Sequence, residues 1–190
     1  MNPPPSPDET HITLTNKTRE KINRYLMRNE SKKYTEILRI PHTQLKSGLR
    51  IPSMILWEGA PVECYKTNRK YKIYNNQGFT VQSWNYEGSE AEDSITIKDD
   101  ETYDLYIIPL TDFNYLIRSG FAITCHRAQG KTIQGKIRIY DTDHPHMTKR
   151  WLYTAVSRTT DFDNLSLANL CPANLSLTNI NELNSFGEDS

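Results

Sequence analysis

The sequence changes character twice along its length, and this division restricts the possible folds more than any single motif does. Residues 51–110 contain short runs rich in β-branched and aromatic residues, such as KYKIYNNQGFTVQSW and YDLYIIPL, separated by Gly, Asn and Asp. Such runs are typical of a small antiparallel barrel or meander. On both sides of them, strand-like and helix-like segments alternate, as in α/β domains. We therefore predict one discontinuous α/β domain, residues 11–50 and 111–170, with a small β-barrel, residues 51–110, inserted into it.

The first part of the α/β domain follows a proline-rich leader. Residues 1–10 (MNPPPSPDET) offer almost nothing to bury, so we expect them to be disordered. A strand over Ile12–Thr15 then leads into a helix, for which Asn16 is the expected N-cap. At the opposite end of the chain, residues 171–190 form a polar, acidic tail.

The second part of the α/β domain contains strands that alternate with helices. Residues 121–124 form a short apolar strand, and His126–Thr132 is a turn that opens a helix. Residues 136–141 predict the next strand. Pro145 then lies near the first turn of a helix, where its fixed φ is tolerated, and residues 164–170 form a last strand.

Composition excludes several classes of protein. Apolar residues make up 36% of the chain, and no run of them approaches the roughly 20 residues needed to cross a bilayer. The N-terminus has neither the basic start nor the apolar segment of a secretory signal. Cys64, Cys125 and Cys171 are far apart, so they predict no disulfide framework and no zinc site. We expect an intracellular protein, cytoplasmic or nuclear, in a reducing compartment.

The net charge is zero, but the charges are unevenly distributed. Residues 11–50 contain ten Lys/Arg against three Glu, and residues 116–160 contain eight Lys/Arg against two Asp. Residues 85–104 contain eight acidic residues and one lysine. Two basic segments therefore flank an acidic one, and we hypothesise that the acidic segment is an exposed hairpin that repels phosphates. Solvated surface throughout is the simpler alternative.

The stretch AITCHRAQGKT, residues 122–132, ends in the same Gly-Lys-Thr as a phosphate-binding loop. A phosphate-binding loop has the pattern G-x-x-x-x-G-K-[ST], which requires glycine at position 125. That position holds Cys125, whose Cβ obstructs the backbone amides that close around phosphates. No apolar strand ending in Asp-Glu follows to hold magnesium. The pattern therefore argues against a small kinase-like enzyme.

Taken whole, the same stretch resembles the fifth conserved motif of superfamily 1 helicases, Ala-x-Thr-x-His-[Lys/Arg]-x-Gln-Gly-x-Thr. YTAVSRTT, residues 153–160, resembles the sixth motif, Tyr-x-Ala-x-Ser-Arg, and TLTNKTREKIN, residues 13–23, resembles the fourth. EGAPVECYKTNRKYKIYNNQGFTV, residues 58–81, is similar to the small barrel of RecD-like members. The resemblance covers about residues 11–168 and points to the RecD-like 5′-to-3′ branch, which includes phage and large-virus replication helicases.

This resemblance implies an α/β, RecA-like second motor domain of a DNA helicase. Such motors hydrolyse ATP with Mg²⁺ between two lobes and move single-stranded DNA, or RNA, across them. The first lobe, with its phosphate loop and magnesium-binding acids, is not in these 190 residues. We therefore expect a piece of a longer protein, or a reduced gene product, that binds a first lobe in cis or in trans. We expect the chain alone to be inactive.

The motifs also imply site residues. Arg158 is the candidate arginine finger, although a helix C-terminus often carries an arginine that only complements the helix dipole. Gln129, Gly130 and Thr132 are expected to face the nucleotide, with a helix cap as the alternative for Thr132. The candidate nucleic-acid-binding residues carry hydroxyl, amide, aromatic or cationic groups suited to phosphates and bases: Thr124, His126, Arg127, Asn16 and Tyr153.

Several residues have a second explanation, and so does the function. For His126, a partly buried imidazole is an equally good explanation. Trp84, Tyr71 and Tyr74 are expected in the barrel core rather than stacked on bases. DTDHPHM, residues 141–147, has metal-ligand types but predicts a turn that caps the next helix. A non-catalytic module that binds nucleic acid or a protein partner is the alternative function.

Overall fold

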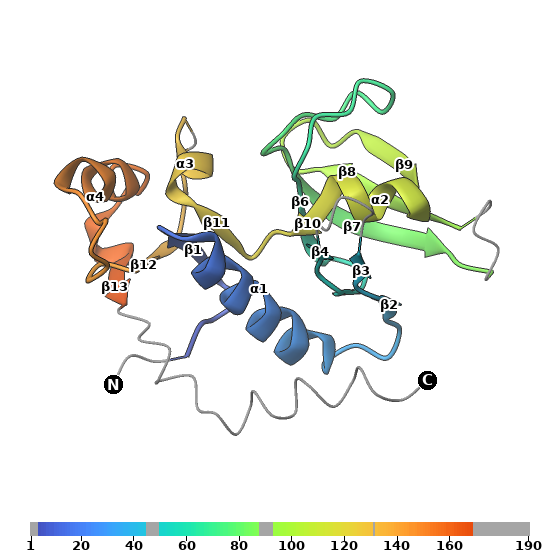
Figure 1. The fold of residues 1–190 in the computed structure, drawn as a ribbon, viewed down its shortest axis with the longest axis horizontal. Helices are drawn as coiled ribbons and strands as arrows, with labels where there is room; N and C mark the ends of the chain where they lie inside the picture. The colour runs from blue at the N-terminus through green and yellow to red at the C-terminus, as the bar shows by residue number, and fades with distance from the viewer. Residues whose placement is uncertain (1–3, 45–49, 88–92, 131, 169–190) are drawn as a thin grey trace.

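The computed structural model describes residues 4–44, 50–87, 93–130 and 132–168, and one of its two larger sheets is a parallel four-stranded sheet, on the left of Figure 1. The strand order is β11-β1-β12-β13, with every neighbouring pair parallel. The four strands are β1 (Glu9–Thr13), β11 (Ala122–Thr124), β12 (Lys136–Tyr140) and β13 (Leu165–Ala168). Segments from both ends of the chain thus form one sheet, and the predicted α/β fold is confirmed.

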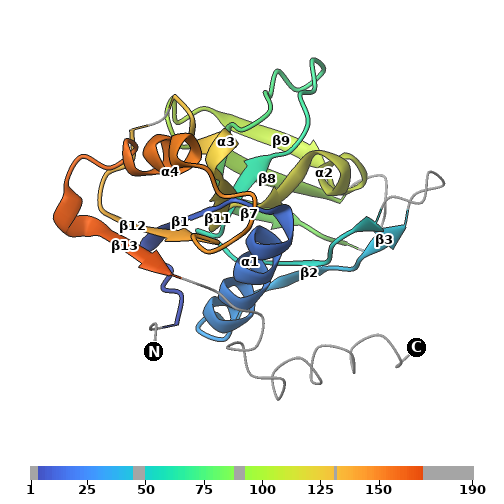
Figure 2. The same ribbon diagram turned by 60° about the vertical axis from the view of Figure 1, so that its left-hand side comes forward.

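Helices cover both faces of this sheet because side chains alternate between the faces along each strand. Ile12, Ile137 and Ile139 pack on one side, beneath α3 (Cys125–Ala128) and α4 (Lys149–Val156). Ala122 and Tyr140 face the other side, where they belong to one cluster with Ile22 and Leu26 of α1 (Asn16–Ser31). Figure 2 shows the ribbons of α1 and α4 on opposite sides of this sheet. The result is a three-layer α/β arrangement with a separate apolar core on each side of the sheet.

The start of the chain departs from the prediction. Glu9 and Thr10, expected in a disordered leader, are the first residues of β1. The carbonyl of Pro4 accepts a hydrogen bond from Arg138, at 3.0 Å, and the Arg138 guanidinium pairs with Glu9 at 2.7 Å. The leader prediction is therefore wrong for the described residues 4–10, because the sheet supplies polar partners that composition does not reveal. Residues 1–3 and the predicted tail, 171–190, lie outside the described residues.

Two helix predictions also need correction. The N-cap of α1 is Thr15, whose hydroxyl accepts a hydrogen bond from the amide of Thr18, so Asn16 is the first helical residue. The turn at residues 126–132 opens no helix, because the short helix α3 (Cys125–Ala128) lies within it and β12 is the next element. Pro145 lies near the first turn of α4 as predicted, in the turn before the Thr148 cap.

The inserted module is a five-stranded antiparallel sheet with the order β10-β6-β7-β8-β9. Two short pairs, β2 with β5 and β3 with β4, precede it. The elements are β2 (Leu38–Ile40), β3 (Thr43–Gln44), β4 (Arg50–Ile51), β5 (Met54–Leu56), β6 (Pro61–Cys64), β7 (Gly78–Asn85), β8 (Ser94–Asp99), β9 (Leu105–Pro109), α2 (Leu110–Leu116) and β10 (Ile117–Ser119). A 3₁₀ turn, η1 (Phe162–Asn164), precedes β13.

The module extends beyond its predicted bounds. We assigned residues 111–119 to the parallel domain, but α2 and β10 belong to the antiparallel sheet and share its core. Gly120 follows, where the chain crosses back to the parallel sheet; a Cβ there would lie 3.0–3.2 Å from the backbone of Val62. Among the described residues, no helix is long and apolar enough to span a membrane.

Candidate nucleotide and nucleic-acid site

The predicted nucleotide-facing residues lie where strands of the parallel sheet end. Because β1, β11 and β12 are parallel, their carboxyl ends and the loops that follow gather at one edge of the sheet. The chain turns sharply after α3, where Gly130 has a φ of +85°, a conformation that favours glycine. Gln129 and Gly130 are exposed there. Thr132 is also exposed, and no helix begins at it, so the alternative of a helix cap is wrong; Lys131 lies outside the described residues.

Arg158 lies beside this turn. The amide of Ile133 donates a hydrogen bond to the carbonyl of Arg158 at 2.9 Å, and Ile133 and Thr159 form a parallel bridge. The Arg158 guanidinium donates from Nε to the carbonyl of Thr154 at 3.1 Å and from Nη2 to the hydroxyl of Ser157 at 3.0 Å. The structure therefore brings the two helicase-like motifs, about thirty residues apart in the chain, into direct backbone contact.

Cys125 belongs to the core and not to this site. Its side chain is buried against α4, and its thiol lies 3.7 Å from the carbonyl of Trp151. Burial raises the pKa of the Cys125 thiol, partly offset by the charge of Arg158 nearby. A buried protonated thiol occupies the position at which a phosphate-binding loop requires glycine, which agrees with the rejection of that loop.

Asp141 follows β12 and already has structural partners. Its carboxylate accepts hydrogen bonds from the amides of Leu14 and Thr15, both at 3.1 Å, and from the hydroxyl of Thr18 at 2.6 Å. The N-terminus of α1 thus receives its anion from within the chain. The expectation that the 141–147 turn caps the following helix is wrong, because Thr148 caps α4 and Asp141 binds the turn that precedes α1.

The Asp141 carboxylate is hydrogen-bonded through both oxygens, from the amides of Leu14 and Thr15 to one and from the Thr18 hydroxyl to the other. Within the part of the chain that the structure describes, no group of three or more His, Cys, Asp or Glu residues could hold a metal ion. At this edge of the sheet the described residues bring together a guanidinium and a glycine turn.

The predicted nucleic-acid residues of the α3 segment have different surroundings. Thr124 ends β11 and is half-buried, while His126 is exposed, so the alternative of a buried imidazole is wrong. Arg127 is held by the inserted module: its Nη1 lies 2.7 Å from Oε2 of Glu63, and both side chains are largely buried. Its guanidinium also lies 5.3 Å from the centre of the Tyr65 ring. Arg127 thus links the parallel domain to the module.

The other two predicted nucleic-acid residues lie on different helices. Asn16 is exposed in the first turn of α1, and Tyr153 is exposed on α4. Asn16 lines a pocket between α1 and the inserted module. Tyr153 is not among the residues that line this pocket, so the structure brings Asn16, but not Tyr153, to it.

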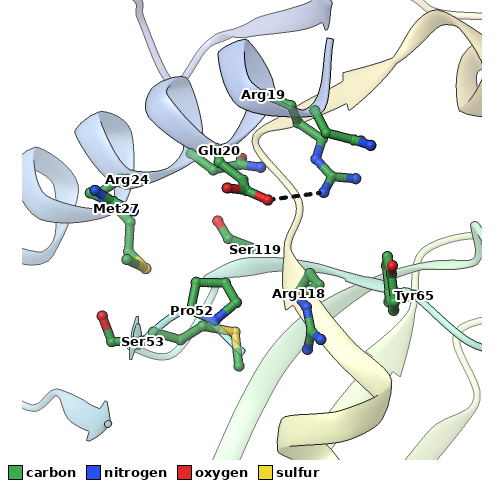
Figure 3. A pocket seen from close by; sticks show the side chains of 12 residues that line it. Arg19, Glu20, Arg24, Met27, Pro52, Ser53, Tyr65, Arg118 and Ser119 are labelled. Atoms are coloured by element: carbon green, nitrogen blue, oxygen red, sulfur yellow. Dashed lines mark ion pairs between the residues drawn. The ribbon is translucent and has the colours of Figure 1, made fainter. Parts of the chain in front are cut away.

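That pocket, which we call the arginine pocket, has a volume of about 140 Å³ (Figure 3). Its lining includes Arg19, Glu20, Arg24, Tyr65, Arg118 and Ser119. Burial and nearby guanidinium groups lower the pKa of Arg19 and of Arg118. The sequence motifs single out neither Tyr65 nor Arg118 as a site residue, because the pocket is lined from three distant segments of the chain. The basic excess of residues 11–50 was the available signal, and it did not locate the pocket.

Two expectations for the module need correction. Tyr71 and Trp84 pack against its core as predicted, but Tyr74 is 61% exposed, so the core prediction is wrong for Tyr74. The acidic segment is only partly an exposed hairpin: Asp93 and Asp99 are buried and accept hydrogen bonds from backbone amides. Residues 88–92 of that segment lie outside the described residues.

Comparison with known proteins finds a similarity to a helicase domain. A family model, the UvrD-like helicase C-terminal domain, matches residues 119–161, which include both the Gly130 turn and Arg158. No curated protein sequence matches the chain. The matched segment covers the α3–α4 half of the candidate site but not the inserted module.

Solved structures of Pif1 helicases share the fold. A structure of two coordinating Pif1 helicases at forked double-stranded DNA has a TM-score of 0.61 at 18% identity, over 96% of this chain and 46% of that one. The structure of Pif1 from Candida albicans has a TM-score of 0.59 at 14% identity, over 94% of this chain and 50% of that one. The structure of Bacteroides Pif1 bound to single-stranded DNA has a TM-score of 0.57 at 18% identity, over 96% of this chain and 46% of that one. The chain thus shares a helicase-like, RecA-type α/β fold with these structures and spans about half the length of these proteins.

Proposed function

We propose that this chain acts as the C-terminal motor domain of an ATP-dependent DNA helicase. The observation that carries the proposal is the contact between Ile133 and Arg158, which brings a glycine turn and an arginine to one edge of the parallel sheet. The resemblance to superfamily 1 helicases supports it, as does a Pif1 of the same fold that was solved with ADP-AlF3 and single-stranded DNA. We further propose that the helicase belongs to the RecD-like branch, that it moves in the 5′-to-3′ direction, and that it acts in DNA replication.

In this proposal, Arg158 is the arginine finger. A planar guanidinium suits the negative charge that develops on the γ-phosphate oxygens during phosphoryl transfer. The hydrogen bonds to Thr154 and Ser157 hold the guanidinium at the end of α4, which reduces the entropy lost when it meets the phosphate. ATP with Mg²⁺ supplies the phosphoryl group and the metal charge, and a first lobe would hold the magnesium.

Gln129, Gly130 and Thr132 would line the same nucleotide from the adjoining turn. Thr124 and His126, three to eight residues earlier in the chain, would contact phosphates of the single strand. Asn16 and Tyr153 would contribute further contacts. One short segment would then respond to both ligands, so a change at the nucleotide can move the strand contacts. Arg127 would act by positioning this segment, since Glu63 already binds its guanidinium.

The test is ATP hydrolysis by the chain joined to the first motor domain of a superfamily 1 helicase, with and without single-stranded DNA. Arg158→Gln should lower the hydrolysis rate by about 10³-fold or more, as loss of an arginine finger does, while strand binding remains. Arg150→Gln is the matched control, because Arg150 is exposed on the same helix. A loss of less than a few-fold for Arg158→Gln would contradict the assignment.

The same assay separates the alternative function. The chain without a first lobe is expected to show no turnover. If the joined protein also shows none, although it folds and binds single-stranded DNA, the non-catalytic nucleic-acid-binding module is the better description.

A further inference from the structure

The arginine pocket carries an excess of positive charge, and part of its wall is buried. Arg19, Arg24 and Arg118 line it, and Arg127 lies against the same Tyr65 ring. Arg19 is buried and Arg118 is half-buried, whereas Arg24 is exposed. The carboxylates nearby are Glu20 and Glu63, and Glu63 is paired with Arg127. Four guanidinium groups against two carboxylates leave two uncompensated positive charges, and charge of one sign that is partly removed from water is costly unless an anion balances it.

Two polar groups in the wall could take a further partner. The Arg19 side chain is 8% exposed, and within the described residues its guanidinium has one carboxylate at ion-pair distance, that of the half-exposed Glu20, 4.0 Å away. The hydroxyl oxygen of Ser119 is buried and has no hydrogen-bond partner among the described residues. Buried polar groups almost always have partners, so both groups call for a ligand with several acceptor oxygens.

The pocket is also rigidly organised. The Arg118 guanidinium lies 4.8 Å from the centre of the Tyr65 ring, and that of Arg127 lies 5.3 Å from it. The negative face of an aromatic ring attracts such cations, which offsets their mutual repulsion. Nη1 of Arg118 also donates to the carbonyls of Asn114 and Ile117, each at 2.7 Å. The cations are therefore held in place before any ligand arrives.

We propose that the arginine pocket binds one phosphodiester group of a single-stranded nucleic acid. Its volume of about 140 Å³ is below the roughly 300–1,000 Å³ of sites for drug-sized ligands, so it suits a phosphate rather than a whole nucleotide. Arg127, next to His126, adjoins the pocket through Tyr65, so a strand on the α3 segment can continue into it. This inference rests on the proposed function and adds a strand contact on the boundary with the inserted module.

The test is binding of a fluorescently labelled oligothymidylate, measured by anisotropy over a range of salt concentrations. Arg24→Gln and Arg118→Gln should each weaken binding about 5-fold and reduce the slope of log K against log salt by about 0.7, the contribution of one phosphate contact on a single strand. Arg24 is exposed, so its replacement leaves the fold intact. Arg69→Gln, exposed on the module away from the pocket, should change neither quantity.

Other outcomes would overturn the proposal. The pocket would be excluded from the path of the strand if the affinity for the oligonucleotide and the salt slope were the same in Arg24→Gln and Arg118→Gln as in Arg69→Gln. Inorganic phosphate that displaces the oligonucleotide at an equal concentration of phosphate groups would indicate a site for free phosphate instead. Arg158→Gln should bind the oligonucleotide normally, so a failed hydrolysis test and a failed pocket test are distinguishable.

Discussion

Replacing Glu63 by glutamine tests the contact that joins the parallel domain to the inserted module. The Arg127–Glu63 pair has an N–O distance of 2.7 Å, with 12% and 3% of the two side chains exposed. Glu63→Gln keeps the shape of the side chain but leaves the buried Arg127 cation without its anion. Removing one partner of a buried ion pair typically costs about 3–5 kcal/mol. We expect a loss near the lower end, about 3 kcal/mol, because Tyr65 still contacts the Arg127 guanidinium.

The pair should be studied as a double-mutant cycle by urea unfolding. Arg127→Gln should cost a similar amount, since it leaves the Glu63 carboxylate buried. The double variant should be less destabilised than the sum of the two single variants, by about 2 kcal/mol, because neither charge then remains alone. Trp fluorescence and circular dichroism should report the same transition, because the cycle assumes two-state unfolding.

The exposed pair Lys70–Asp112 provides the control. Its N–O distance is 3.2 Å, but 70% of the Lys70 side chain is exposed. Lys70→Gln should therefore produce no measurable change in stability, as is usual for surface pairs. If Glu63→Gln and Arg127→Gln also leave the free energy of unfolding unchanged, the pair does not hold the two parts together. The same follows if the effects of the two variants on that free energy simply add.

Two further perturbations probe other buried contacts. Asp141→Asn should destabilise the chain by about 2 kcal/mol, because the Leu14 and Thr15 amides lose a charged acceptor. Asp143 is exposed, so Asp143→Asn should have little effect. Equal midpoints of urea unfolding for the two variants would refute this. Burial lowers the pKa of His11, which faces Tyr140, Glu9 and Arg138. The unfolded imidazole takes up a proton near pH 6.5 and the folded one only at lower pH, so stability should fall by up to about 1.4 kcal/mol per pH unit below pH 6.5. His11→Gln should flatten this fall, and an unchanged pH profile would contradict it.

Much of the fold could be predicted because its signals are local. The alternation of strands and helices on both sides of residues 51–110 indicated a discontinuous α/β domain, and the parallel sheet that unites the two parts agrees with it. The motif at residues 122–132 and the motif around Arg158 are each read from a few neighbouring residues. Their order in the chain suggested that they meet, and the hydrogen bond between Ile133 and Arg158 joins them.

The sequence predictions were wrong where a segment distant in the chain supplies the hydrogen-bond or ion-pair partner. The leader is ordered because Arg138 binds Pro4 and Glu9 from another strand. Periodicity alone could not select Thr15 over Asn16 as the cap of α1, because Asp141 reaches the same turn from 126 residues away. In each case a polar group gains partners that its neighbours in the sequence do not reveal.

The sequence by itself therefore determined which elements form and which motifs this chain carries, because backbone propensity, apolar periodicity and motif spacing all act over short distances. Only the tertiary structure decided how its charges are used. It paired Arg127 with Glu63, directed Asp141 to the start of α1, and gathered Arg19, Tyr65 and Arg118 around one pocket. Electrostatic and hydrogen-bonding partners are fixed by proximity in space, and proximity in space is set only when the whole chain has packed.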